Sequence, residues 1–379
     1  MIRSVTLDNY RGFRQFELHD LGRVNLIVGT NNAGKTSVLE AVNLLASSGD
    51  PTSLWSTLWR RGEDFEEREV GATSRHVDIK RLFNGHNAGV GCRFSLTAET
   101  DGGRASLTAE VEEPRRPQPV TQATLFEPFD NAVEPDYPFR PSVLALRWQG
   151  QEDISVHLDL TRRGGVSAES IRWPPRGREE VRRPTVRLIT AAALSPELVI
   201  ELFEETVLTP DEDMVYEALR IIEPSIERLA TSGTDRRRTG TSSRPGVRGG
   251  LLVRCNGIKD RIPIGSMGDG IWRLLGLALA LVRTEGGILL VDEIDTGLHY
   301  SVMENMWKLV HQTARRLRIQ LFATTHSRDC YESLAAISRD TVSKNSEITI
   351  QRIERGKERS VAYSEQEIIA AARRHTEVR

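Results

Sequence analysis

The chain has 379 residues, with 51 basic and 53 acidic side chains and an isoelectric point near 6.5. This balance excludes a polycation that coats nucleic acid over its whole surface, while leaving room for local basic patches. The three cysteines are isolated and lack metal-ligand spacing, so we expect reduced, buried thiols rather than a disulfide framework or a zinc site. The N-terminus has no signal-peptide pattern, and no apolar run approaches the roughly 18–20 residues of a membrane span. The composition therefore predicts a cytoplasmic protein without a membrane segment.

The N-terminal segment has the pattern of strands, a glycine-rich loop and a helix. A strand begins at Ile2, Arg11-Gly12-Phe13 marks a turn, and Val24–Val28 is a short apolar strand that leads into the loop. Apolar residues then recur at helical spacing from Lys35 to Ala46. The loop itself reads Gly29-Thr30-Asn31-Asn32-Ala33-Gly34-Lys35-Thr36. Strand, glycine loop and helix in this order are the context that a phosphate-binding loop requires.

This loop is a candidate site for a nucleoside triphosphate with Mg²⁺. Its backbone N–H groups and the positive end of the helix dipole form an anion site. Gly29 and Gly34 let the backbone wrap the phosphates. Lys35 is expected to reach the β- and γ-phosphates, and the Thr36 hydroxyl to ligate Mg²⁺. The predicted nucleotide-binding residues of the loop are Gly29, Asn31, Asn32, Ala33, Gly34, Lys35, Thr36 and Ser37.

The middle of the chain changes character. The runs 93–98 and 104–112 alternate like strands around Asp101-Gly102-Gly103, which predicts a β-hairpin. A proline-rich stretch follows at 114–141 and an arginine-rich stretch at 172–187, and Val186–Ile189 has the pattern of a strand that returns to the core.

Two helices are predicted between Ser195 and Thr231, where apolar residues keep helical spacing as far as Leu229. The stretch Glu197–Glu227 contains ten acidic residues and one basic residue, which is typical of either a solvated surface or a docking face. Residues 235–250 then form a flexible basic loop.

From Leu251 onward, helical and strand patterns alternate. Helices are predicted at 271–282 and 301–317, and strands at 288–291, 319–324, 347–353 and 360–363. Ser364-Glu365-Gln366-Glu367 has the form of a capping box that opens a last helix.

Chemically important side chains follow two of these strands. Asp292 and Glu293 come at the carboxyl end of the strand 288–291, where ligands of open α/β sheets bind. We expect Asp292 to hold Mg²⁺ through water and Glu293 to polarise the attacking water. His326 follows the next strand, in Thr324-Thr325-His326-Ser327, and is placed to sense the γ-phosphate and stabilise transition-state charge. The sequence therefore predicts ATP hydrolysis with Lys35, Glu293 and His326 as catalytic residues and Thr36 and Asp292 as metal ligands.

A second glycine-containing segment, Ser266-Met267-Gly268-Asp269-Gly270, precedes the helix that starts at Ile271; we name it the signature segment. A serine and a glycine at a helix N-terminus form a second anion site. One chain does not need two such sites for one nucleotide, but a two-fold dimer does. Ser266 and Gly268 of each protomer can then face the γ-phosphate held by the other protomer's Lys35.

Taken together, these motifs resemble the ABC-type ATPase heads, and among them the RecF, SMC and OLD-like (overcoming lysogenization defect) branch. The resemblance rests on 7–13, on 29–37, on the signature segment, on 290–299 and on 324–327. It implies an α/β fold of the P-loop NTPase type, a mixed central sheet with helices. The implied division is ATPase lobe I at 1–84, an inserted β-rich and loop segment at 85–190, a helical insertion with the basic loop at 191–250, and lobe II at 251–379.

The resemblance also implies a homodimer that sandwiches two ATP molecules, with Asp295 lying across the interface and further assembly open. Met267 departs from the glycine of the usual signature, so the contact across the dimer is expected to differ in shape. Gln149 and Gln151 are both candidates for the glutamine loop of the family, and Arg60 or Arg61 could supply its lobe-one arginine.

The function that the resemblance favours is an ATP-driven switch that scaffolds and gates a separately encoded effector, a nuclease or toxin, in defence against foreign DNA. OLD-like nucleases carry a Toprim domain after this ATPase, and no acidic metal cluster follows the last predicted helix. The alternative is a RecF-like head that clamps DNA directly, with the arginines of 172–187 and 236–238 on phosphates. The near-zero net charge argues against it. A transporter ATPase is a third hypothesis, which the altered signature and the large inserted segment disfavour.

Overall fold

The structure is a computed structural model that describes residues 1–69, 72–113, 142–150, 152–171, 184–192, 194–231, 250–340 and 347–373. The proline-rich stretch, residues 172–183 of the arginine-rich stretch, the basic loop and Gln151 lie outside the described residues. Among the helices in the described ranges, none is both long and apolar enough to cross a membrane.

A six-stranded sheet, which we name the core sheet, forms the centre of the fold. Its strand order is β11-β15-β16-β3-β17-β18. The first five strands are parallel and β18 pairs with β17 in the antiparallel direction. The bounds are β11 Val186–Ile189, β15 Ile288–Val291, β16 Gln320–Thr324, β3 Val24–Val28, β17 Ile348–Arg352 and β18 Val361–Tyr363. All of these strands were predicted, and β15 is the uninterrupted apolar run that is typical of a parallel strand covered on both faces.

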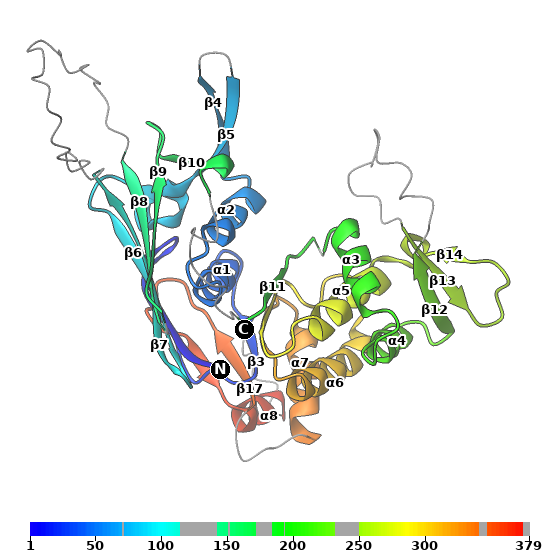
Figure 1. Cartoon of the computed structure of the whole chain (residues 1–379). Coiled ribbons are helices and arrows are strands. Elements are labelled where there is room, and N and C mark those ends of the chain that lie inside the picture. The colour runs from blue at the N-terminus through cyan, green and yellow to red at the C-terminus, as the bar shows by residue number, and fades with distance from the viewer. Residues whose placement is uncertain are drawn as a thin grey trace, which may run out of the picture.

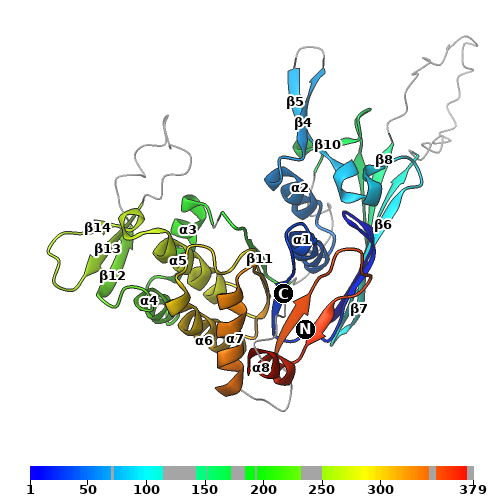
Figure 2. The ribbon, with the colours of Figure 1, turned by 180° about the vertical axis from the view of Figure 1, so that it is seen from behind.

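The two faces of the core sheet belong to two separate hydrophobic clusters. Leu290 and Phe322 pack on one side, while Leu289 and Leu321 pack on the other, as the two-residue period of a strand requires. Helix α1 covers the first side and helices α3 to α7 gather on the second (Figures 1 and 2). The helices are α1 Lys35–Ala46, α2 Pro51–Arg60, α3 Pro196–Thr206, α4 Glu212–Arg220, α5 Asp269–Val282, α6 Tyr300–Arg316, α7 Arg328–Asp340 and α8 Glu365–Arg373.

A second, antiparallel sheet covers the other side of α1 and has the order β2-β1-β6-β7-β8-β9 (Figure 1). Its strands are β1 Ile2–Tyr10, β2 Phe13–Leu18, β6 Arg93–Thr100, β7 Gly103–Glu112, β8 Val143–Gln149 and β9 Ile154–Asp159. The hairpin predicted around Asp101-Gly102-Gly103 is therefore present. It is not a separate insertion, however, because β6 pairs directly with β1 and β11 lies in the core sheet. Most described strands of 85–190 thus belong to the same sheets as the N-terminal strands, which differs from the division expected from the sequence.

A β-hairpin extends from the end of α2, away from both large sheets (Figure 1). Strands β4 Asp64–Glu69 and β5 Ala72–Asp78 form it, and β10 Gly165–Ser167 pairs with β5. Single turns of 3₁₀ helix follow at Ile79–Leu82, Asn84–His86 and Ala168–Ser170.

The prediction of two helices between Ser195 and Thr231 is confirmed for α3 and α4, but the last apolar residues were wrongly assigned to the second helix. Ile226 and Leu229 lie in strand β12 Ile226–Thr231, which pairs with β13 Leu251–Cys255 and, through it, with β14 Ile262–Pro263. Pro224 disfavours a continuous helix. A register shift between Ile226 and Arg228 lets two residues at helical spacing both be buried from a strand.

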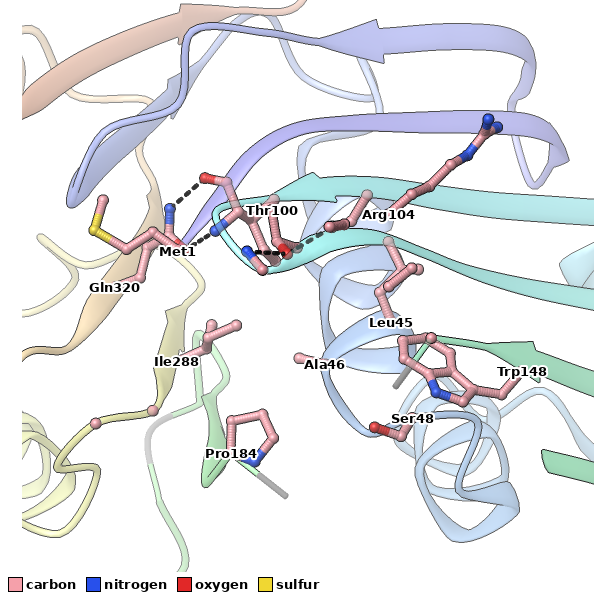
Figure 3. A pocket seen from close by; sticks show the side chains of 18 of the residues that line it. Met1, Leu45, Ala46, Ser48, Thr100, Arg104, Trp148, Pro184, Ile288 and Gln320 are labelled. Atoms are coloured by element: carbon pink, nitrogen blue, oxygen red, sulfur yellow. Dashed lines mark hydrogen bonds between the residues drawn. The ribbon is translucent and has the colours of Figure 1, made fainter. Parts of the chain in front are cut away.

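A cavity of about 390 Å³ lies at the far end of α1 from the glycine loop (Figure 3). Leu45 and Ala46 of α1, Trp148 of β8 and Ile288 and Gln320 at the starts of β15 and β16 line it. It therefore lies at the amino ends of the core strands, on the opposite edge from the predicted nucleotide site.

Candidate functional site

The glycine loop connects β3 to α1 and is shaped by the N-terminal hairpin. Gly34 has a φ of 102°, a left-handed conformation that favours glycine. A Cβ added at Gly34 would lie 2.4 Å from Cζ of the Phe13 ring, so Phe13 packs directly against the loop. This explains why the turn Arg11-Gly12-Phe13 accompanies the loop in this chain. Thr30, Asn31 and Asn32 are exposed at the loop tip, while Ala33 and Ser37 are buried.

Lys35 is 6% exposed and its amine faces into the loop. Nζ donates to the carbonyls of Gly29 (2.8 Å) and Thr30 (3.0 Å) and lies 3.2 Å from Nδ1 of His326. Burial lowers the pKa of Lys35 below its ordinary value, and the carboxylates of Asp292 and Glu293 oppose this shift. The amine is thus a partly desolvated cation fixed at the centre of the loop.

The Thr36 hydroxyl and the Asp292 carboxylate are directly hydrogen-bonded to each other. Thr36 Oγ1 donates to Asp292 Oδ2 at 3.1 Å, and Thr324 Oγ1 donates to Asp292 Oδ1 at 2.6 Å. Hydroxyl and carboxylate oxygens are hard donors of the kind that Mg²⁺ prefers, and Mg²⁺ sites of nucleotide enzymes need only one or two protein ligands beside the phosphates. The described residues accordingly contain no cluster of three or more His, Cys, Asp or Glu able to hold a metal ion. The pair Thr36 and Asp292 fits a magnesium ion held together with a triphosphate.

Glu293 has a left-handed backbone with φ 50° and a half-exposed carboxylate. Its backbone N–H donates to Thr324 Oγ1 at 2.8 Å, and its Oε2 accepts from Thr296 Oγ1 at 3.2 Å. Nε2 of His326 lies 3.8 Å from Glu293 Oε1. When the Lys35 ammonium donates to Nδ1, the proton of a neutral His326 ring is on Nε2 and faces Glu293. His326 therefore lies between Lys35, at hydrogen-bond distance, and Glu293, which is slightly farther away.

The signature segment lies at the start of α5, beside the turn that follows Asp295, and not among the contacts of Lys35. Ser266 is exposed in the 3₁₀ turn Ile264–Met267, and Gly268 is exposed just before α5. Asp295 accepts a hydrogen bond from Thr325 Oγ1 at 2.7 Å. The structure thus brings Lys35, Thr36, Asp292, Glu293 and His326 together in one chain and leaves Ser266 and Gly268 apart from them.

The two arginine candidates of lobe I differ in their contacts. Arg61 Nε donates to Glu40 Oε1 at 2.6 Å, and its NH2 group lies 3.4 Å from Ser37 Oγ, next to Thr36. Glu40 also pairs with the buried Arg11, at 2.8 Å. Burial raises the pKa of Glu40, and the charges of Arg11 and Arg61 oppose this shift. Arg61 therefore contacts α1, the helix that follows the glycine loop, whereas Arg60 is exposed at the end of α2.

Of the two candidates for the glutamine loop, only Gln149 lies within the described residues. Gln149 ends β8 in the antiparallel sheet, where Ser106 Oγ donates to its side chain at 3.4 Å. The strand next to β15 is β11, and the residue at its carboxyl end is Thr190. The backbone N–H of Asp292 donates to the carbonyl of Ile189 in β11.

Two site residues had no role in the sequence interpretation. Thr324 was part of the motif around His326 but was given no role of its own. In the structure its hydroxyl connects the Asp292 carboxylate to the backbone N–H of Glu293. Arg273 is buried in α5 and donates to the carbonyls of Asp292 and Glu293. The signal for Arg273 was its place as a lone charge in an apolar helix.

Comparisons with known proteins agree with this geometry. Residues 24–329 match the family model described as "AAA domain, putative AbiEii toxin, Type IV TA system". The chain is 20% identical over 356 residues to an ATP/GTP phosphatase of Helicobacter pylori, a match that covers 90% of this chain and 89% of that protein. It is 34% identical over 79 residues to the DNA replication and repair protein RecF of Bacillus velezensis, covering 21% of each.

Solved structures of SMC heads are similar over nearly the whole chain at low identity. The SMC head domain of Thermotoga maritima aligns with a TM-score of 0.42 and 13% identity, covering 96% of this chain and 98% of that one. A Pyrococcus furiosus SMC head bound to the C-terminal domain of ScpA aligns with a TM-score of 0.47 and 12% identity, covering 99% of each.

Proposed function

The chain belongs to the AAA-domain family of P-loop ATPases and hydrolyses ATP, and from this premise we propose that it is a dimeric ATP-driven switch that gates a separately encoded effector. The observation that carries the chemical part of the proposal is the convergence of Lys35, Thr36, Asp292, Glu293 and His326 at the carboxyl ends of β3, β15 and β16. Their roles follow from the contacts of each side chain.

In the proposed complex, the loop N–H groups and Lys35 bind the β- and γ-phosphates. The contacts of Lys35 with two loop carbonyls hold its amine at the centre of the loop, so little side-chain entropy is lost when phosphate oxygens replace them. Thr36 and Asp292 would hold Mg²⁺, and the ion neutralises charge on the phosphates when bound. Thr324 fixes the Asp292 carboxylate by its 2.6 Å hydrogen bond.

Glu293 is the proposed general base. Its carboxylate accepts a proton from water as the water oxygen bonds to the γ-phosphorus and the bond to the ADP oxygen breaks, giving ADP and phosphate. His326 lies between Lys35 and Glu293, where its ring can donate through Nε2 to the γ-phosphate oxygens that gain charge. The position of the His326 ring beside Glu293 would therefore depend on whether a γ-phosphate is bound.

The dimer is proposed from the position of the signature segment. Ser266 and Gly268 are exposed at the N-terminus of α5, apart from the contacts of Lys35 in the same chain. A two-fold partner would bring this helix end to the γ-phosphate held by the other protomer, with Asp295 beside the interface. Two bound nucleotides would therefore close the dimer, and hydrolysis would open it.

The description of the matching family names a putative toxin of a toxin–antitoxin system, and such a system pairs two separately encoded products, which supports a partner polypeptide for this chain. A role in defence against foreign DNA is the form of this switch that we favour. The exposed acids Glu197, Glu201 and Glu204 on α3 offer a docking face for a basic partner.

A RecF-like clamp on DNA is the second candidate, and the similarity to RecF over 79 residues favours it. In that case DNA affinity should fall steeply with salt, because each neutralised phosphate releases counterions.

Native mass spectrometry of the Glu293→Gln protein, tagged and expressed with its flanking genes, separates the two candidates. The variant should retain ATP and hold the closed state. A stoichiometric second polypeptide that is lost in Lys35→Ala would support the gated effector. An ATP-dependent dimer that retains DNA and no second polypeptide would replace it with the clamp.

A further inference from the structure

Helix α5 contains a buried cation that the proposed chemistry does not use. After Asp269, Arg273 is the only charged residue of the helix, and it is 4% exposed. Burial lowers the pKa of Arg273, while the carboxylates of Asp292, Asp295 and Glu293 oppose that shift. A buried guanidinium is tolerated only where its donors are paired.

The donors of Arg273 pair with the ends of two core strands. Its NH1 group donates to the carbonyl of Thr190, just past β11. Its NH2 group donates to the carbonyls of Asp292 (2.6 Å) and Glu293 (2.9 Å), just past β15. The ladder between β11 and β15 ends at Ile189 and Val291. Arg273 therefore joins the two strands where their backbones stop pairing with each other.

Arg273 and Thr324 hold the backbone of Glu293 at its carbonyl and at its N–H, respectively. Its N–H donates to Thr324 Oγ1 and its carbonyl accepts from Arg273. Glu293 has a φ of 50°, a conformation that a non-glycine residue keeps only when its surroundings enforce it. Arg273 and Thr324 therefore hold the backbone from which the Glu293 side chain extends, while Thr296 contacts both its carbonyl and its carboxylate.

The same helix begins at the signature segment. Arg273 lies four residues after Asp269, the first residue of α5, which is about 6 Å along a helix. Gly270 packs against the turn after Asp295, where an added Cβ would lie 2.8 Å from the carbonyl oxygen of Gly297. A helix moves as a rigid body over so short a distance. A displacement of the signature segment would therefore displace the guanidinium that holds Glu293.

We propose that Arg273 is a positioning residue for ATP hydrolysis. It couples the position of the signature segment to the orientation of the Glu293 carboxylate. The proposal rests on the proposed role of Glu293 as the general base. The proposed phosphate contacts within one chain come from the glycine loop and Lys35, whereas Arg273 donates to backbone carbonyls. Loss of the coupling should therefore slow hydrolysis and leave ATP affinity unchanged.

Arg273→Lys is the informative variant, because an ammonium keeps the charge but cannot donate to both strand ends in the fork geometry of a guanidinium. We expect kcat to fall roughly 10- to 100-fold, part of the 10²–10⁴ that a general base contributes, while KM and the Kd of a fluorescent ATP analogue change less than about threefold. Expressing kcat per titrated nucleotide site removes any effect of unfolded protein. Arg283→Lys is the control: it lies at the end of α5, is half-exposed and pairs with Glu205 at 2.9 Å.

A double-mutant cycle tests whether Arg273 acts through Glu293. If it does, Glu293→Gln with Arg273→Lys should hydrolyse ATP as slowly as Glu293→Gln alone. A further multiplicative fall, wild-type kcat in Arg273→Lys, or an equal loss of kcat and affinity would overturn the proposal. Wild-type turnover in Glu293→Gln would instead refute the proposed base.

Discussion

The buried ion pair between Arg11 and Glu40 makes a quantitative prediction about stability. Arg11 is 5% exposed and Glu40 is 4% exposed, and their charged atoms are 2.8 Å apart. Glu40→Met preserves volume and helix propensity in α1 but leaves the Arg11 cation without this partner. Removing one member of a buried pair costs roughly 3–5 kcal/mol. Because Glu63 still accepts from Arg11 at 2.9 Å, we expect the lower end, about 3 kcal/mol in the free energy of unfolding.

Removing both charges should restore most of the loss. In Arg11→Met with Glu40→Met neither buried charge is left without the other. Glu63 and Arg61 each lose a partner but are more exposed, at 17% and 33%, and apolar replacements of a buried pair are often neutral. We expect the double variant to unfold within about 1 kcal/mol of wild type, far less than the sum of the two single losses, so the two substitutions should be strongly non-additive. Urea unfolding followed by circular dichroism measures all three variants. Glu304→Met, an exposed helical acid paired with Lys308 at 2.7 Å, is the control and should change stability by less than about 0.5 kcal/mol. Additive single losses, or a Glu40→Met cost below about 1 kcal/mol, would refute the reasoning.

Three further predictions concern the nucleotide site. Lys35→Met should weaken ATP binding roughly 10- to 100-fold, the value of a hydrogen bond from a charged group, as measured by fluorescence titration. Lys35→Met should also stabilise the ATP-free protein at neutral pH, because the pKa of Lys35 is lowered in the folded state and its charge therefore destabilises the fold below that pKa. The gain in stability should vanish as the pH rises toward 10.5. An equal gain at all pH values would contradict this reasoning. Glu293→Gln should bind ATP normally and hydrolyse it roughly 10²–10⁴ times more slowly in a phosphate-release assay, and wild-type turnover would place the base elsewhere. Chelating Mg²⁺ should stop hydrolysis. Thr36→Ala should raise the Mg²⁺ concentration for half-maximal activity roughly tenfold. If this concentration is unchanged in the variant, Thr36 is not a ligand of the metal.

The sequence predicted the core strands and the glycine loop well, because both are encoded locally. A run such as 288–291 is apolar throughout, and the loop combines a strand, glycines and a helix start within 20 residues. The pairing of β6 with β1 was not predictable in this way. These strands lie about 90 residues apart, and the alternation within each one does not specify its partner. Ile226 and Leu229 were wrongly predicted to be helical for a related reason, since a register shift in a strand can bury two residues at helical spacing.

The proposed site residues divide into those that contact the nucleotide and those that hold them. Local motifs identify the first group, because Lys35, Asp292 and His326 each follow a strand that ends at the same edge of the core sheet. The second group acts from other elements: Phe13 packs on Gly34 from the N-terminal hairpin, and Arg273 reaches Glu293 from α5. Their side chains contact main-chain atoms whose positions depend on the whole fold. In the sequence alone, Phe13 and Arg273 therefore look like ordinary apolar and basic residues, and only the assembled fold shows their roles. The left-handed backbone of Glu293 persists because contacts from β16 and α5 hold it, so the aim of this carboxylate depends on how the sheet and the helix beneath it are packed.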